Sequence, residues 1–162
     1  IYIPDEKLKI YGDLLRIITA QSMEYFSSRP TENKQTILFC LDEFASFGKL
    51  QIVESLRKLR KRRIRILVLT QSVSDVDMIY GKDERKAMLG NFKFTVILGC
   101  KDTETQEYFS KMIGEKRSLL ATDPYQKPHP IIKPADLAHL EQDLFVICDD
   151  GAIRLKKNFY FK

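Results

Sequence analysis

The sequence predicts an α/β fold in which helices flank a parallel sheet, with a β-hairpin near the end of the chain. Three apolar runs, at residues 37–41, 64–70 and 94–99, are typical of buried strands. Stretches with helical periodicity separate these runs, and alternating strands and helices build parallel sheets. The hairpin is predicted by Asp150 and Gly151, which lie between two runs rich in β-forming residues.

The composition is that of one globular domain. A chain of 162 residues with 44% apolar residues can bury a core of ordinary size. No stretch approaches the roughly 20 apolar residues of a membrane span and no signal peptide is present, which predicts a soluble intracellular piece. We expect Cys40, Cys100 and Cys148 to be buried and reduced, because they end apolar runs without a CxxC pattern.

The first residues suggest that the chain starts inside a fold. Residues 1–4, Ile-Tyr-Ile-Pro, have the pattern of a strand that enters a turn, and no initiator methionine precedes them. We therefore expect a fragment of a longer chain. An amphipathic helix is predicted for residues 7–27, because side chains of its apolar face recur at spacings of three and four. That predicted face consists of Tyr11, Leu14, Leu15, Ile18, Ser22 and Tyr25.

Two adjacent carboxylates, Asp42 and Glu43, follow the first apolar run. Ligands of open α/β sheets bind at the carboxyl ends of the strands. There, Asp42 can hold Mg²⁺ through a water or hydroxyl, while Glu43 orients an attacking water, as nucleotide hydrolysis requires. This is the pattern of a Walker B motif. The alternative is an acidic pair that only caps the next helix.

Positive charge is concentrated after this motif. The net charge is +5, and seven of the nine residues from Arg57 to Arg65 are basic. They lie on and beyond a helix predicted for residues 50–61, where cations favour the negative end of the helix dipole. This basic segment has three interpretations. It can be a solvated face, it can contact a nucleic-acid backbone, or it can supply an arginine to the nucleotide of a neighbouring subunit. The nucleic-acid candidates are Arg57, Lys58, Lys61, Arg62 and Arg63.

The second apolar run ends at Gln71. An amide at the end of the strand that follows a Walker B strand can sense a γ-phosphate or an attacking water, because it both donates and accepts. We expect Asp42, Glu43 and Gln71 to face one crevice. A polar cap on a loop is the alternative for Gln71.

The second half of the chain predicts shorter elements. An acidic turn at residues 75–77 precedes a helical segment that ends near Met88. Asp102 or Thr103 caps the next helix, which Gly114 ends, and Thr103 with Gln106 has the pattern of a capping box. Residues 115–133 contain three prolines and predict a long loop, and Pro134 opens a short helix.

Four stretches of the sequence carry a resemblance to a known family. They are LDEFASFGKL at 41–50, IRILVLTQS at 64–72 with IYGKD at 79–83, EYFSKMIG at 107–114, and IIKPADLAHL at 131–140. Their order and spacing resemble the TraG/TraD-type coupling proteins of bacterial conjugation and type IV secretion. The resemblance covers nearly the whole chain.

The resemblance implies a RecA-like P-loop NTPase fold and an ATP-driven motor that uses ATP and Mg²⁺. Such proteins form hexameric rings at the cytoplasmic face of the inner membrane and couple single-stranded DNA, a relaxosome or a protein substrate to the secretion channel. By this resemblance Asp42 and Glu43 match the Walker B pair, and Gln71 matches the sensor glutamine. Arg60 lies nearest to the family's arginine finger, with Arg62 or Arg63 as substitutes.

The chain also departs from the family pattern. No GxxxxGK[ST] sequence occurs in it, so the phosphate-binding loop and its lysine are absent. Membrane segments and the helical insertion are absent too, and from the resemblance we expect all three to belong upstream of residue 1. We therefore expect the carboxyl-terminal portion of a motor domain, which alone neither binds ATP tightly nor hydrolyses it.

The absent P-loop strand has a structural consequence. In sheets of this class it usually lies between the sensor strand and the strand that follows. We expect either that later strands shift to close the gap or that self-association covers the exposed edge.

Two other functions fit parts of the sequence. A stand-alone nucleic-acid-binding module would use the basic segment and would leave Asp42 and Glu43 dispensable, although the segment lacks interleaved aromatic residues. Half of a helicase would pair a carboxylate strand with a polar motif and would require a second RecA-like domain.

Overall fold

The computed structural model describes residues 4–116 and 128–160. The chain divides into two compact units, whose described residues are 4–91 in the first and 92–116 with 128–160 in the second. Each unit has its own sheet.

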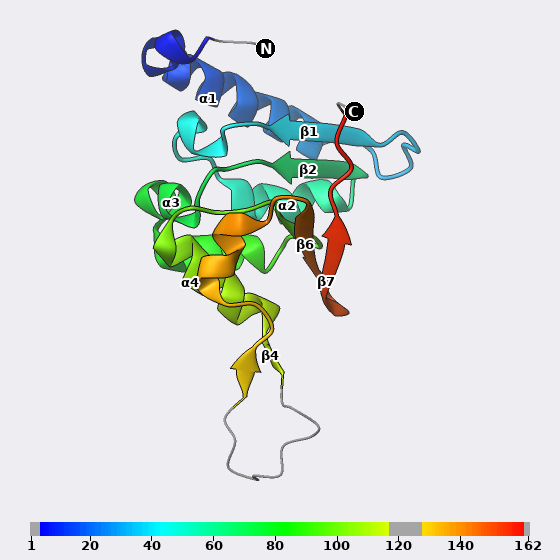
Figure 1. Ribbon diagram of the computed structural model, residues 1–162. Coiled ribbons are helices and arrows are strands. Elements are labelled where there is room, and N and C mark those ends of the chain that lie inside the picture. The colour runs from blue at the N-terminus through cyan, green and yellow to red at the C-terminus, as the bar shows by residue number, and fades with distance from the viewer. Residues whose placement is uncertain (1–3, 117–127, 161–162) are drawn as a thin grey trace. The chain divides into compact units, whose positions relative to one another are not determined.

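The first unit is built around two parallel strands. Its elements are α1 (Asp5–Ser27), β1 (Ile37–Leu41), η1 (Phe44–Phe47), α2 (Ile52–Arg60), β2 (Ile64–Val68) and α3 (Val73–Leu89). β1 and β2 lie side by side with their arrowheads pointing the same way (Figure 1), and Ile37 pairs with Ile64. The predicted unit of two parallel strands connected by a helix is therefore present.

Within the described residues of the first unit, one face of this two-stranded sheet is covered. Phe39 contacts Phe26 of α1 edge to face, with ring centroids 5.6 Å apart. On the opposite face, Leu38 is 59% and Leu67 46% exposed, and the Cys40 thiol is free and exposed. The prediction of a strand buried on both faces is thus wrong, and so is the prediction that Cys40 is buried. The reason is that α1 places Phe26 against the face that carries Phe39.

Helix α1 packs with a different face from the one predicted. It contacts α2 and η1, and its buried side chains are Leu15, Thr19 and Met23. Of the predicted face, Leu15 alone is buried, while Tyr11, Leu14, Ile18 and Tyr25 are exposed. The helix carries apolar residues on more than one side, so periodicity could not select the packed one.

Helix α3 begins earlier than predicted. The predicted acidic turn at residues 75–77 forms its first turn, because the Ser72 hydroxyl accepts a hydrogen bond from the Asp75 N–H at 3.0 Å and caps the helix. Gly81, with φ 75° and ψ 162°, interrupts the helix after two turns. This backbone conformation suits glycine, which lacks a Cβ atom.

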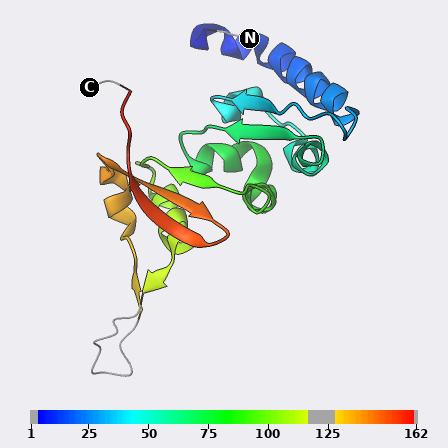
Figure 2. The same ribbon diagram turned by 90° about the vertical axis from the view of Figure 1, so that its right-hand side faces the viewer.

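The second unit contains an antiparallel sheet and one long helix. Its elements are β3 (Thr95–Ile97), α4 (Thr103–Ile113), β4 (Glu115–Lys116), β5 (His129–Pro130), η2 (Pro134–His139), β6 (Asp143–Cys148) and β7 (Gly151–Lys156). β3 pairs antiparallel with β6, and β6 pairs with β7 (Figure 2). The predicted hairpin is confirmed, with Gly151 at φ 114° in its turn.

The core of this unit lies between its sheet and its helices. The buried residues of this cluster are Ile97, Cys100, Ile113, Ile132, Leu137, Leu140 and Phe145. On the outer side of the sheet, Val96 is 54% exposed, so β3 is not the fully buried strand that its apolar run predicted.

The ends of α4 confirm part of the prediction. Asp102 is the N-cap, since its carboxylate accepts from the Thr105 N–H at 2.9 Å, and Gly114 at φ 101° follows the last residue. The predicted capping box is wrong. The Gln106 amide donates instead to the carbonyls of Cys100 and Lys101, both at 3.1 Å.

The predicted long loop falls largely on residues 117–127, outside the described residues. On either side of them, β4 and β5 form a short antiparallel ladder that the sequence did not predict. The expected strand at the start of the chain also lies outside the described residues.

In the first unit, β2 is hydrogen-bonded to β1. Both expected ways of covering the position of the missing P-loop strand, a shift of later strands and self-association, stay predictions. Among the described helices, none combines the length and apolarity needed to span a bilayer.

Candidate functional site at the carboxyl ends of β1 and β2

The carboxyl ends of the two parallel strands bring together two of the predicted site residues. Asp42 and Glu43 follow β1 directly, and Gln71 lies three residues beyond the end of β2. The Gln71 side-chain Nε2 donates a hydrogen bond to Glu43 Oε1 at 3.0 Å. All three side chains are exposed. Glu43 and Gln71 therefore meet at the carboxyl ends of the strands, while the expectation that Asp42 faces one crevice with them stays a prediction.

Glu43 has a left-handed backbone conformation, with φ 49° and ψ 51°. For a residue other than glycine this costs about 1–2 kcal/mol, and it persists where neighbouring groups hold the chain. The Asp42 side-chain Oδ1 accepts a hydrogen bond from the Glu43 N–H at 3.0 Å.

Backbone hydrogen bonds connect the two strand ends around Glu43. Leu69 N–H donates to the Leu41 carbonyl at 3.0 Å, and Phe44 N–H donates to the Leu69 carbonyl at 2.9 Å. The residues immediately before and after the carboxylate pair are thus both tied to the end of β2.

The carboxylates at the carboxyl ends of β1 and β2 suit a magnesium ion that is also bound by the phosphates of a nucleotide. They do not suit an ion whose ligands all come from the protein. Mg²⁺ in nucleotide sites is typically held by one or two carboxylates together with phosphate oxygens and waters. The exposed Asp42 carboxylate can supply such a ligand. Within residues 4–116 and 128–160, no group of three or more His, Cys, Asp or Glu side chains is arranged to hold a metal.

Arg60 lies near the amino end of β2, at the end of the sheet opposite to Glu43 and Gln71. It is the last residue of α2, which precedes the start of β2, and its side chain is exposed. The five residues of β2 lie between this end of the sheet and Gln71, and a strand of five residues is about 15 Å long. The fold therefore does not bring Arg60 to Glu43 of the same chain.

Several basic residues of the segment are engaged within the first unit. Lys58 pairs with Glu54 at 2.8 Å. The Arg62 guanidinium donates to the Arg29 carbonyl, and Arg63, at φ 57°, donates to the Lys34 carbonyl at 3.4 Å. These arginines therefore hold the segment that leads into β1.

Other cations of the segment are available to a ligand. Arg57, Arg60 and Lys61 are exposed. Across the part of the chain that the structure describes, none of the three has an ion-pair or hydrogen-bond partner for its side chain. Arg57 also lines a shallow hollow of about 290 Å³ with Gln51, Val53, Glu54 and Glu84.

A buried hydroxyl next to the site was not predicted. Tyr80 of α3 is 5% exposed and bonds to the segment that follows η1. Burial, with a smaller contribution from the Glu84 carboxylate, raises the pKa of Tyr80 above its ordinary value of 10.0. The available signal was the Tyr-Gly pair at residues 80–81, where the helical pattern breaks.

The sequence matches one family and several characterised relatives. The profile of the family described as "TraM recognition site of TraD and TraG" matches residues 36–142. Protein VirD4 of Agrobacterium fabrum is 24% identical in an alignment of 172 positions that covers 95% of this chain and 26% of VirD4. The conjugal transfer protein TraG of the same organism is 24% identical, with 89% of this chain and 24% of TraG covered. The chain thus spans about a quarter of the length of these relatives.

Solved structures of the plasmid coupling protein TrwB have the same fold. The complex of TrwB with the ATP analogue ADPNP has a TM-score of 0.77 and 25% identity, and covers 93% of this chain and 39% of that chain. The complex with ADP and Mg²⁺ has a TM-score of 0.76 and 26% identity over the same shares. The fold is that of a RecA-like P-loop NTPase. The chain belongs to the TraG/TraD family of coupling proteins and corresponds to its carboxyl-terminal part.

Proposed function

We propose that this chain is the carboxyl-terminal portion of the motor domain of a type IV secretion or conjugation coupling protein. In the longer parent, ATP hydrolysis drives DNA or protein substrate toward the secretion channel. Family membership supports this proposal, as does the likeness to TrwB, which was solved with an ATP analogue and with ADP and Mg²⁺. The parent would act as a hexamer at the cytoplasmic face of the inner membrane.

The hydrogen bond between Gln71 and Glu43 is the observation that carries the proposal. In this arrangement Asp42 would hold the Mg²⁺ of a bound nucleotide, and Glu43 would orient the attacking water. The Gln71 amide holds the Glu43 carboxylate and would sense the γ-phosphate. The bound Mg²⁺ would supply neutralisation of phosphate charge. The phosphate-binding loop would come from the part of the parent upstream of residue 1.

Arg60 would serve the nucleotide of a neighbouring subunit. It lies at the edge of the sheet opposite to Glu43 and is exposed, so it cannot serve the site of its own chain. An arginine supplied in trans stabilises the charge that develops during phosphoryl transfer.

The substitution Asp42→Asn in the full-length parent tests the nucleotide-binding role. The asparagine oxygen can still accept from the Glu43 N–H, so the loop is kept, while the charge that attracts Mg²⁺ is lost. We expect ATP turnover, measured with and without single-stranded DNA, to fall about a hundredfold. Asp83→Asn, an exposed carboxylate on α3, is the matched control. Equal turnover by the two variants would contradict the role of Asp42.

Nucleic-acid binding by the basic segment is a second candidate function. The exposed and unpaired cations Arg57, Arg60 and Lys61 favour it. Binding of single-stranded DNA through phosphates weakens steeply as salt rises. The second candidate would be favoured over the motor if two results were found together. Binding of single-stranded DNA would weaken steeply with salt to the same extent with and without Asp42→Asn, and the parent would show no ATP turnover.

A further inference from the structure

The hydroxyl of Tyr80 bridges the two ends of the turn that follows η1. Its oxygen accepts a hydrogen bond from the Leu50 N–H at 3.1 Å, and its proton is donated to the Gly48 carbonyl, also at 3.1 Å. Leu50 is 2% exposed and Tyr80 5% exposed, so water does not compete for these bonds. One side chain of α3 thus fixes a segment that lies 30 residues earlier in the chain.

The ring of Tyr80 holds the residue that follows Glu43. It stacks on Phe44 with centroids 5.3 Å apart and an interplanar angle of 9°. Phe44 is fully buried, and its N–H is bonded to the Leu69 carbonyl. Because Phe44 is fixed at both its backbone and its ring, the preceding Glu43 is held in its left-handed conformation.

Tyr80 and Gln71 are connected through the same helix. Gln71 directly precedes Ser72, the N-cap of α3, and Tyr80 lies two turns further along that helix. A second contact between the same segments is the ion pair of Lys49 with Glu84 at 2.8 Å, whose side chains are 62% and 30% exposed, so it contributes little. The buried phenol is thus a direct link between the loop of Glu43 and the helix that starts after Gln71.

We propose that Tyr80 is a positioning residue for Glu43. By stacking on Phe44 and bonding to Gly48 and Leu50, it sets the distance between the Glu43 carboxylate and the Gln71 amide. The inference rests on the proposed function of Glu43 as the group that orients the attacking water. Tyr80 itself touches neither nucleotide nor water in this scheme.

The substitution Tyr80→Phe tests the inference, because it removes both hydrogen bonds and keeps the stacked ring. In the 162-residue chain, we expect amide hydrogen exchange of Leu50 to become about tenfold faster. Exchange in β6, in the second unit, serves as the internal reference. Tyr25→Phe, the same chemical change at a 74% exposed site, is the matched control and should leave exchange unchanged.

The second measurement is the steady-state ATPase of the full-length parent. We expect Tyr80→Phe to lower kcat about tenfold with KM for ATP unchanged, because a misplaced Glu43 affects turnover and not binding. A general loss of folded protein would lower the apparent kcat together with the thermal midpoint, which separates the two explanations. Phe44→Leu removes the stack and keeps the hydrogen bonds, and should lower kcat in the same way.

The outcomes distinguish this inference from the proposed function. Unchanged exchange at Leu50 would show that the phenol does not hold the loop, and would overturn the inference. Faster exchange with unchanged kcat would also overturn it, because the loop would then move without consequence for turnover. If the unsubstituted parent has no ATPase activity, the motor proposal fails and the positioning role fails with it, whereas the exchange result still reports on the loop.

Discussion

The position of the Glu43 carboxylate depends on contacts at the scale of single residues. The side chain accepts from Gln71, and its backbone N–H is bonded to Asp42. Because Glu43 is left-handed, it points differently from a residue that continues β1. Its orientation is therefore a product of the surrounding bonds and not of the strand alone.

Replacement of Gln71 tests this dependence. We expect Gln71→Ala to lower ATP turnover of the full-length parent about tenfold, because the Glu43 carboxylate loses its donor. The free energy of unfolding should change by less than about 0.5 kcal/mol, since both side chains are exposed. Turnover and thermal unfolding are measured side by side, with the exposed Gln21→Ala on α1 as the control. Turnover equal to that of the control would argue against a role for the amide.

The sequence predicted the meeting of Glu43 and Gln71 because both end apolar runs of parallel strands. It could not predict the left-handed backbone of Glu43 or the bonds of Tyr80. Those bonds join residues 30 positions apart, and no local pattern reports such a contact. The roles of Asp42, Glu43, Gln71 and Arg60 in catalysis remain predictions.

At the scale of elements, helices and strands were predicted more reliably than the faces they bury. α1, α2 and α4 begin and end within two residues of their predicted bounds. The packed face of α1 was wrong because its apolar residues surround more than one side. Leu38 and Cys40 were expected to be buried because an unbroken apolar run indicates a strand that is covered on both faces. In this unit one face of the strand is covered.

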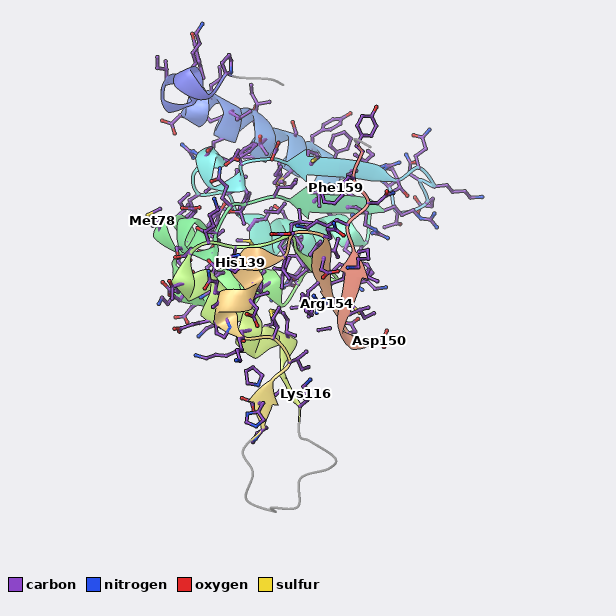
Figure 3. The ribbon with its side chains drawn as sticks, in the orientation of Figure 1. Met78, Lys116, His139, Asp150, Arg154 and Phe159 are labelled. Atoms are coloured by element: carbon purple, nitrogen blue, oxygen red, sulfur yellow. The ribbon has the colours of Figure 1, made fainter. Side chains whose placement is uncertain are left out.

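The hairpin of β6 and β7 is held by ion pairs that predict a dependence on pH. Asp143 pairs with Arg154 at 2.6 Å and with Lys156 at 2.9 Å, and Arg154 lies on β7 (Figure 3). Hydrogen bonds from Lys156 and Arg154 hold the pKa of Asp143 below its ordinary value of 3.8. A carboxyl whose pKa is lowered on folding stabilises the fold above that ordinary value, and the stabilisation is lost as pH falls through the folded-state pKa.

We therefore expect Asp143→Asn to lower the thermal midpoint at neutral pH. The difference from the unsubstituted chain should shrink as the pH falls below 3.8 and the native carboxyl becomes protonated. Thermal unfolding across this acid range measures it. Asp150→Asn, in the turn between β6 and β7, is the control. A difference that stays constant down to the lowest pH would contradict the ion-pair explanation.

At the scale of the whole molecule, the chain consists of two compact units. Leu137 is fully buried in the core of the second unit, whereas Leu155 on β7 is 47% exposed. We expect Leu137→Ala to lower the free energy of unfolding by about 2–5 kcal/mol, and Leu155→Ala to lower it by much less. Denaturant unfolding with hydrogen exchange measures both. Equal losses from the two substitutions would show that the assigned core does not stabilise this unit.

We propose that the carboxyl ends of β1 and β2 form the hydrolytic site of a coupling-protein motor. The most direct measurement is ATP binding and turnover by the full-length parent and by its Glu43→Gln variant, with and without single-stranded DNA. We expect the parent to hydrolyse ATP and the variant to bind ATP without turning it over. Turnover by the variant equal to that of the parent would contradict this proposal.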